Sequence, residues 1–349
     1  MTMPTTKELP VPPFFDATRV GEVWRVPYQE RATYAQEWAA THNIQPAAQD
    51  QTRICLFLID VQNTFCLPEY ELFAGGQSGS GAIDDNARLC EFIYRNLARI
   101  TKIIPTMDTH MAMQIFHPIF WINEQGEHPH QTPMTISPEE VENGVWKVNP
   151  AVADNLPGWD YSDLEKYALH YAQKLAQKAK YPLTVWPYHA MVGSTSHALV
   201  SALEEALFFY SVARQSQVQY ELKGNNPLTE NYSALGPEVL EDHNGQAIAQ
   251  ENNALIEQIL GFDAVIIGGQ AKSHCVAWTV EDLLREIKRR DANLAQKIYL
   301  LEDCTSPVVI PEVVDYTSHA DEAFERFAQA GMHRVESIEP MERWLNFPS

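Results

Sequence analysis

Short apolar runs alternate with longer amphipathic stretches from Arg53 onward, and this alternation constrains the fold more than any other feature of the chain. In the segment 83–100, for example, Leu89, Phe92, Ile93 and Leu97 recur at helical spacing. Apolar runs that alternate with such stretches are typical of a parallel sheet covered by helices. The pattern predicts a three-layer α/β/α fold, with a mainly parallel sheet of about six strands and helices on both faces.

The predicted strands are the apolar runs Ile54–Asp60, Lys102–Met107, Leu183–Trp186, Val218–Lys223, Ala264–Gly268 and Ile298–Glu302, with a weaker candidate at Arg334–Ile338. The predicted helices lie near 83–100, 162–178, 197–214, 252–260, 274–290 and 321–331. Residues 1–50 are rich in Pro, Thr and Gln, and we expect an extended arm that lies on its own domain or on a partner subunit. The domain itself is predicted to span 51–349, with an insertion at about 120–180.

The charge balance excludes several classes of partner. The 349 residues include 46 Asp and Glu but only 25 Lys and Arg, for a net charge of −21. Nucleic acids and anionic membranes are bound through basic surfaces, and no Lys/Arg cluster in the chain supplies one. We therefore expect neither partner, and we interpret the acidity as a solubility feature of solvated helix faces.

The five cysteines form no CxxC pair and no disulfide framework. The N-terminal residues have neither the basic start nor the apolar stretch of a signal peptide, and no apolar stretch approaches the roughly 18 residues of a membrane span. We expect a cytoplasmic protein.

Reactive residue types follow the predicted strands. In parallel α/β sheets, ligands bind beyond the carboxyl ends of the strands. Strand ends in this chain deliver Asp60, Asp108 with His110, Lys223, and a Gly-Gly loop that leads to Cys275. The predicted strand 183–186 leads to Trp186 and His189 in the same way. Five such strand ends indicate an active site at that edge.

Cys275 stands out among the cysteines because it follows a glycine loop and opens a predicted amphipathic helix. A thiol at a helix N-terminus feels the positive end of the helix dipole, which favours the reactive thiolate. The simpler interpretation, a buried cysteine that packs as a small apolar residue, is kept for Cys55, Cys66, Cys90 and Cys304.

The motifs LFLIDVQNTF, MDTH, VWPYH, ELKG with NYSAL, and GGQAKSHCV occur in the order seen in the isochorismatase-like cysteine hydrolases. The chain resembles their nicotinamidase branch most. The resemblance spans about 53–335 as spaced motifs and leaves out the arm and the region 120–180. It implies a catalytic triad of Cys275, Asp60 and Lys223, with Cys275 as nucleophile, Asp60 as proton carrier and Lys223 as the residue that holds Asp60. Taken alone, Asp60 would be a strand-end cap and Lys223 a solvated charge.

The resemblance also implies an oxyanion hole made by the backbone N–H groups of Ala271 and Cys275. In relatives the first of these residues follows a cis peptide bond, which corresponds to Gln270–Ala271 in this chain.

Asp108, His110 and His189 form the second constellation. One carboxylate and two imidazoles suit Zn, Fe or Mn with open positions for water or substrate. In the nicotinamidase branch, the corresponding residues bind a divalent metal, and zinc is the first candidate here. Some relatives have a further His four positions after the first; this chain has Gln114 there and His117 three residues later, so a fourth protein ligand stays open.

Phe65, Trp186 and Tyr232 fall where the nicotinamidases place aromatic side chains around a flat heteroaromatic amide. Aromatic residues are also common in cores, and that interpretation stays open for these three.

The leading hypothesis is therefore a metal-containing amidase that releases ammonia from a small aromatic carboxamide through a thioester, with nicotinamide as the first candidate. One alternative keeps the chemistry but acts on a carbamoyl or ureido amide, and such relatives often lack the metal ligands. An isochorismatase activity would leave Cys275 idle. A non-catalytic binding protein on this fold is the alternative of another class. We expect a homo-oligomer, because relatives commonly form one.

Overall fold

The structure is a computed structural model, and it describes residues 8–177 and 181–348. The chain divides into two compact units. Unit 1 comprises Met1–Met107, Ala198–Glu221 and Asn253–Ser349, and unit 2 comprises Asp108–His197 and Leu222–Asn252. Unit 2 thus takes in more of the chain than the predicted insertion at 120–180. Each unit is described by itself below.

A six-stranded sheet with the order β12-β9-β8-β1-β2-β7 confirms the predicted α/β fold. Its strands are β1 (Ile54–Ile59), β2 (Lys102–Asp108), β7 (Glu221–Lys223), β8 (Ala264–Gly269), β9 (Ile298–Leu301) and β12 (His333–Val335). Strand β1 pairs in parallel with both β2 and β8, and β9 pairs in parallel with β8 and β12. Every residue of β1 and β8 is buried, as expected for strands covered on both faces.

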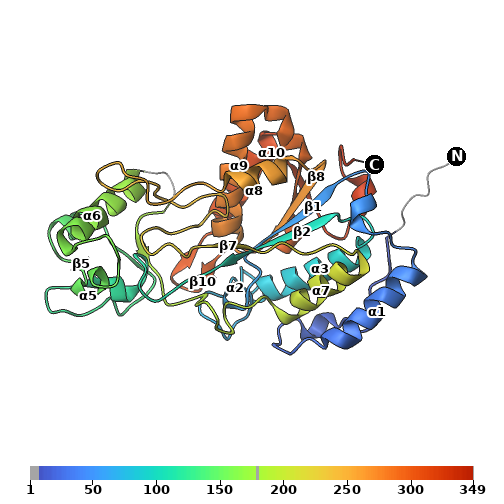
Figure 1. Cartoon of the computed structure of the whole chain (residues 1–349), viewed down its shortest axis with the longest axis horizontal. Coiled ribbons are helices and arrows are strands. Elements are labelled where there is room, and N and C mark those ends of the chain that lie inside the picture. Colours follow the sequence, from blue (N-terminus) through green and yellow to red (C-terminus); the bar gives the residue numbers. More distant parts are fainter. Residues whose placement is uncertain (1–7, 178–180, 349) are drawn as a thin grey trace. The chain divides into compact units, whose positions relative to one another are not determined.

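Helices cover both faces of the sheet in unit 1. Figure 1 shows α3 (Gly81–Arg95) and α7 (Ser201–Ala213) on one side, and α8 (Asn253–Leu260), α9 (Ala277–Arg290) and α10 (Thr317–Gln329) on the other. The predicted spacing holds in α3, where Leu89, Phe92 and Ile93 are all buried in the main core. The smaller elements of this unit are α2 (Asn63–Cys66) and the hairpin of β10 (Val309–Ile310) and β11 (Val314–Asp315).

The predicted extended arm is wrong for much of its length, because it contains helix α1 (Tyr28–Thr41), which packs on α7. Ala, Glu and Gln in this segment favour a helix, and Tyr34 and Trp38 lie four residues apart on one face. Their rings stack with 5.9 Å between centroids, and Phe14 packs edge-on against Tyr34. The segment from residue 8 to α1 therefore lies on its own unit.

Unit 2 combines a long helix with short helices and strands around a second core. It contains α4 (Pro138–Glu142), α5 (Pro150–Ala153), α6 (Tyr161–Gln177), and the antiparallel pairs of β3 (Trp121–Ile122) with β5 (Lys147–Val148) and of β4 (Met134–Thr135) with β6 (Thr184–Val185). Its core includes Phe116, Phe120 and Trp121 together with Tyr167 and Tyr171 of α6. The predicted helix 162–178 agrees with α6, and its last residue lies outside the described residues.

The prediction that Leu183–Trp186 forms a strand of the main sheet is wrong. Its central residues form β6, which pairs with β4 and does not join the six-stranded sheet. Leu183 and Val185 are buried in the core of unit 2. A short apolar run predicts that its residues are buried but does not say in which core. Here they are buried in the second core and not in the sheet.

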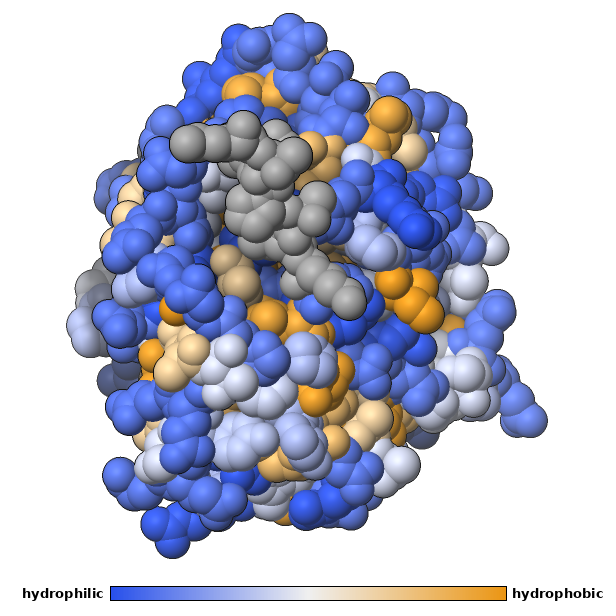
Figure 2. Space-filling model, turned by 90° about the vertical axis from the view of Figure 1, so that its right-hand side faces the viewer, coloured by the Kyte–Doolittle hydropathy of each residue, from blue (hydrophilic) through white to orange (hydrophobic). Residues whose placement is uncertain are grey.

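The surface is mostly hydrophilic on the face shown in Figure 2, with hydrophobic residues scattered among polar ones. Scattered exposed apolar side chains are normal for folded proteins. Among the described residues, no helix combines the length and the apolar character that crossing a membrane requires.

Candidate functional site

Asp60 follows β1 directly and is fully buried. Its backbone φ is +45°, a conformation that non-glycine residues adopt rarely and that is found at functional sites. The hydroxyl of Thr106, on the neighbouring strand β2, bonds to both the backbone and the side chain of Asp60. The Asp60 N–H donates to the Thr106 hydroxyl oxygen over 3.0 Å, and that hydroxyl donates to Asp60 Oδ1 over 2.6 Å. The orientation of this carboxylate is thereby fixed.

The loop that leads to Cys275 leaves β8 beside Asp60. Ile59 of β1 is the register partner of Gly269 of β8, so the residues that follow both strands emerge at the same edge of the sheet. Gly269 has φ +117°, and a Cβ there would overlap the Ile59 carbonyl oxygen. Only glycine allows the two strand ends to approach this closely.

The Gln270–Ala271 peptide bond is cis, as predicted. The Gln270 side chain is fully buried and bonds at both ends. Its Nε2 donates to Asp85 Oδ2 of α3 over 2.7 Å, and its Oε1 accepts from the Ser306 N–H over 3.2 Å. Asp85 also accepts from Arg88 over 2.9 Å. Helix α3 and the segment around Ser306 therefore clamp the residue that precedes Ala271.

Cys275 lies in a wide helical turn, Lys272–Val276, that precedes α9. The sequence predicted that Cys275 would open an α-helix. Helix α9 instead begins at Ala277, two residues after the cysteine. The turn is closed by N–H groups of His274 and Val276 that donate to the Ala271 carbonyl over 3.0 and 3.2 Å. The Cys275 side chain is buried, with 7% of its surface exposed.

Asp108, His110 and His189 come together in unit 2, as predicted for a metal site. Asp108 is the last residue of β2, and all three side chains are buried. Their ligand atoms lie within 4.8 Å of one another. Asp108 Oδ2 is 3.0 Å from His110 Nε2 and 3.9 Å from His189 Nε2.

Backbone carbonyls fix which nitrogen of each imidazole faces the cluster. His110 Nδ1 lies 3.0 Å from the Gly224 carbonyl oxygen, and His189 Nδ1 lies 2.8 Å from that of Pro187. A carbonyl only accepts, so each Nδ1 carries a proton, and Nε2 is the nitrogen that each ring turns toward Asp108. This arrangement of a hydrogen-bonded imidazole is the usual support of a metal ligand.

The electrostatics of the cluster agree with a cation site. Burial opposes the charged form of Asp108, but His110 and Lys223 hold the pKa of that carboxyl well below its usual value. Burial, together with His110, lowers the pKa of His189 well below 6.5. A carboxylate and a neutral imidazole are the protonation states that metal binding needs. One carboxylate and two imidazoles therefore fit a divalent cation such as Zn, Fe or Mn.

Gly224 makes room for this cluster. Its φ is +80°, and a Cβ there would lie 2.5 Å from Asp108 Oδ1 and 2.7 Å from His110 Cε1. Any other residue would displace one of the two ligands.

Lys223 of unit 2 forms an ion pair with Asp108, with 3.1 Å between its Nζ and Oδ1. Its Nζ also donates to the Asn231 carbonyl over 2.9 Å. The predicted triad thus has two members in unit 1, Asp60 and Cys275, and Lys223 in unit 2. Its assembly stays a prediction.

Gln114 and His117 were the two candidates for a fourth protein ligand, and the structure argues against Gln114. The Gln114 amide is consumed by backbone groups: its Nε2 donates to the carbonyls of Gly224 and Asn226, and its Oε1 accepts from the Met111 N–H. His117 is fully buried, and its Nε2 has no hydrogen-bond partner among the described residues. Its ring centroid lies 5.8 Å from that of His189. Burial, together with His110, lowers the pKa of His117 to about 4, which keeps this imidazole neutral.

Two of the three predicted pocket aromatics meet in unit 2. Trp186 Nε1 donates to the Tyr232 hydroxyl over 3.2 Å, and Tyr232 is buried. Phe65 lies in α2 of unit 1, also buried.

Glu230 of unit 2 was missed from the sequence. It is buried, and burial together with Asp108 and Glu238 raises the pKa of its carboxyl well above 4.5. A side-chain hydrogen bond joins it to Tyr232. Its position between Lys223 and Tyr232 in the sequence was the only available signal, because a lone Glu in a polar stretch is usually exposed.

No protein-family model matches this chain. No curated protein sequence matches it. Solved structures do: a nicotinamidase/pyrazinamidase of Acinetobacter baumanii is 19% identical and has a TM-score of 0.48, covering 83% of this chain and 98% of its own. The yeast nicotinamidase Pnc1p is 19% identical with a TM-score of 0.48, covering 81% and 99%. A pyrazinamidase of Pyrococcus horikoshii in complex with zinc is 16% identical with a TM-score of 0.42, covering 81% and 99%. At identities and TM-scores this low the likeness assigns no activity, and the geometry of the site must support one.

Proposed function

We propose that this chain is a cysteine-dependent amidohydrolase that cleaves a small aromatic carboxamide, nicotinamide being the first candidate, to the acid and ammonia. The observation that carries the proposal is the arrangement at the paired ends of β1 and β8. A buried, clamped carboxylate follows one strand, and the loop to a cysteine follows the other at the same edge of the sheet.

The first half of the proposed reaction forms a thioester. Asp60 takes the proton from the Cys275 thiol, and the sulfur attacks the carbonyl carbon of the amide. The oxygen of the tetrahedral adduct carries the negative charge, which the N–H groups of Ala271 and Cys275 would stabilise. Asp60 then returns the proton to the amide nitrogen, the C–N bond breaks and ammonia leaves.

The second half hydrolyses the thioester. Asp60 takes a proton from water, the hydroxide adds to the thioester carbonyl, and the C–S bond breaks. The thiolate regains the proton from Asp60, and the carboxylic acid leaves. Lys223 would supply the positive charge that keeps two acidic groups tolerable in one site.

Asp108, His110 and His189 would hold the divalent cation, with zinc as the first candidate. When bound, the cation would supply a Lewis acid for a ring nitrogen of the substrate or for water. Trp186 and Tyr232 would give the flat substrate an aromatic wall, joined by Phe65.

The test is incubation of the purified, metal-loaded protein with nicotinamide, with ammonia and nicotinic acid as the measured products. Rapid acid quench and mass spectrometry should find the nicotinoyl group on the peptide that contains Cys275. Release of acid without an acyl group on Cys275 in any quench would contradict the nucleophile. Absence of both products would reject nicotinamide, and a panel of benzamide, pyrazinamide and a ureido amide would then decide between substrate classes.

A further inference from the structure

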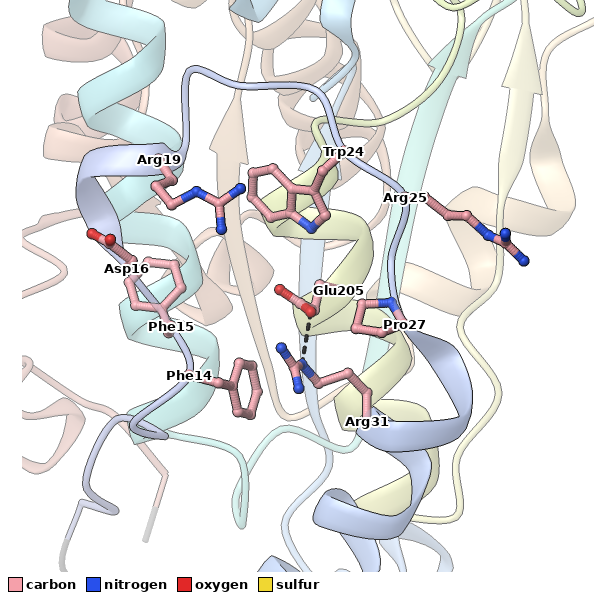
Figure 3. Close-up of a pocket in the computed structure, with 9 residues that line it drawn as sticks. All are labelled: Phe14, Phe15, Asp16, Arg19, Trp24, Arg25, Pro27, Arg31 and Glu205. Atoms are coloured by element: carbon pink, nitrogen blue, oxygen red, sulfur yellow. Dashed lines mark hydrogen bonds and ion pairs between the residues drawn. The ribbon is translucent and has the colours of Figure 1, made fainter.

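A cavity of ≈ 280 Å³ lies in unit 1 between the segment that precedes α1, α1 itself and α7 (Figure 3). Its wall uses the rings of Phe14, Phe15 and Trp24 together with Arg19, Arg31 and Glu205. None of these residues belongs to the machinery proposed above. The volume lies just below the range of about 300–1,000 Å³ that small-molecule pockets occupy, so only a small ligand would fit.

A buried ion pair forms part of the wall of the cavity. Arg31 Nε lies 2.7 Å from Glu205 Oε1, and only 12% and 7% of the two side chains are exposed. The Arg31 guanidinium carbon also lies 3.9 Å from the centroid of the Phe14 ring, a cation–π contact. Arg31 Nη1 also lies 2.7 Å from Oε1 of the exposed Glu30, so two carboxylates fully match this guanidinium and it offers no positive charge to a ligand.

Arg19 supplies the positive charge that this pair does not. Its guanidinium carbon lies 5.2 Å from the centroid of the Trp24 ring, and Figure 3 shows its terminal nitrogens directed toward the cavity. Its Nε bonds to Glu22 over 2.9 Å, but both side chains are more than half exposed, so this surface pair is weak. The two terminal nitrogens of an arginine form a fork that matches the two oxygens of a carboxylate.

The other two charged residues of the wall point away. Figure 3 shows the Asp16 carboxylate and the Arg25 guanidinium directed out of the cavity. Asp16 is engaged with Thr18, whose N–H and hydroxyl both donate to its Oδ1. The positive group that a ligand in the cavity could engage is therefore the guanidinium of Arg19, whose partner Glu22 is itself exposed.

We propose that this cavity binds a small aromatic carboxylate, whose ring packs against Phe15 and Trp24 and whose carboxylate engages the fork of Arg19. Three aromatic side chains favour a flat ring. One guanidinium, paired only weakly with the exposed Glu22, in the same cavity as the buried Glu205 carboxylate favours a monoanion over a phosphate dianion. The inference rests only on unit 1 and does not depend on the proposed function.

The test is isothermal titration calorimetry of the full chain with benzoate, with benzamide as the uncharged analogue and acetate as the analogue without a ring. Benzoate should bind, and each analogue should bind at least about tenfold more weakly, because each lacks one of the two interactions. Equal affinity for benzoate and benzamide would overturn the role of Arg19.

Two matched variants locate the binding. Arg19→Gln should weaken benzoate binding by about tenfold or more. Arg25→Gln removes the same charge from the same segment, but its side chain points away, so it should leave the affinity unchanged. Both side chains are exposed, so thermal unfolding should be the same for both variants. Benzoate binding that survives Arg19→Gln, or that is lost equally in both variants, would overturn the proposal. So would an absence of binding to the unmodified chain.

Discussion

The two units position their polar side chains in different ways. In unit 1, the register of β1 and β8 brings the residues after both strands to one edge, and a threonine of β2 clamps Asp60. In unit 2, loop carbonyls of Gly224 and Pro187 orient His110 and His189. The first arrangement depends on the backbone ladder of a sheet and the second on single hydrogen bonds. The second should therefore be the more sensitive to substitutions in loops.

The largest expected effect separates the chemistry of unit 1 from the cluster of unit 2. Cys275→Ala should lower turnover of the amide by roughly 10⁴-fold or more, because no other group replaces the nucleophile. Metal content, measured by mass spectrometry of the purified protein, should stay the same as in the unmodified chain. Cys90→Ala is the control, since Cys90 is buried in the core beneath α3 and should leave kcat unchanged. Substantial turnover by Cys275→Ala would show that Cys275 is not the nucleophile.

The next effect concerns acid, and one buried histidine of each unit is chosen to test it. Burial lowers the pKa of His274 in unit 1 to about 3 and, with His110, that of His117 in unit 2 to about 4. The unfolded chain binds these protons near pH 6.5, whereas the folded chain does not. Stability is therefore lost as the pH falls below about 6.5, by about 3 kcal/mol for each histidine at pH 4.

Urea unfolding of the metal-free protein at pH 7, 6, 5 and 4 measures this loss. His274→Gln and His117→Gln should each flatten the dependence of the unfolding free energy on pH. His319→Gln is the control, because this side chain is exposed. A dependence that neither buried variant changes would assign the acid sensitivity to other groups.

Gly224→Ala tests the loop-based arrangement of unit 2. The added Cβ must displace Asp108 or His110, and we expect the metal affinity to fall by about 10–100-fold, as for other residues that orient metal ligands. Competition with a chromogenic zinc chelator measures the affinity. Gly245→Ala is matched in unit and in backbone, with φ +77°, but its Cβ would meet nothing within 4 Å. If both variants lost metal affinity equally, the cause would be the strained backbone at a positive φ and not the displacement of Asp108 or His110.

The smallest effect concerns the clamp in unit 1. Gln270→Met keeps the shape of the side chain but removes its hydrogen bonds to Asp85 and Ser306. Leaving buried partners unpaired should lower the free energy of unfolding by about 1–2 kcal/mol, measured by urea unfolding. Gln258→Met loses a reciprocal bond with Gln219 in a half-exposed place, where water replaces it, and should change stability by less than about 0.5 kcal/mol. Equal losses of unfolding free energy in the two variants would show that the hydrogen bonds of Gln270 stabilise the fold no more than an exposed pair does.

The sequence predicted the centre of the sheet well because β1, β8 and β9 are buried at every residue. The observed β1, Ile54–Ile59, is one residue shorter than the predicted strand, and β8 extends one residue beyond its prediction. The same rule failed at Leu183–Trp186, since burial in a second core gives the same apolar run. Helix α1 was missed because it packs through few apolar residues, with Ala35 its only buried residue.

The site shows the same limit at the level of single residues. The three candidate ligand residues Asp108, His110 and His189 were predicted from their types and places, and the structure brings them together. Thr106 and Gly224, which hold or accommodate such residues, were not predicted. A threonine inside a strand and a glycine after one have many common roles, and their contacts arise only when distant segments meet.

The hydrogen bond from His110 to the Gly224 carbonyl has a consequence for the order of events during synthesis. All three residues that would hold the cation leave the ribosome before Gly224, which follows His189 by roughly 35 residues, or a few seconds of elongation. In that interval either nitrogen of His110 can carry its proton. The orientation of His110 for cation binding is therefore set only after the second segment of unit 2, Leu222–Asn252, has been synthesised.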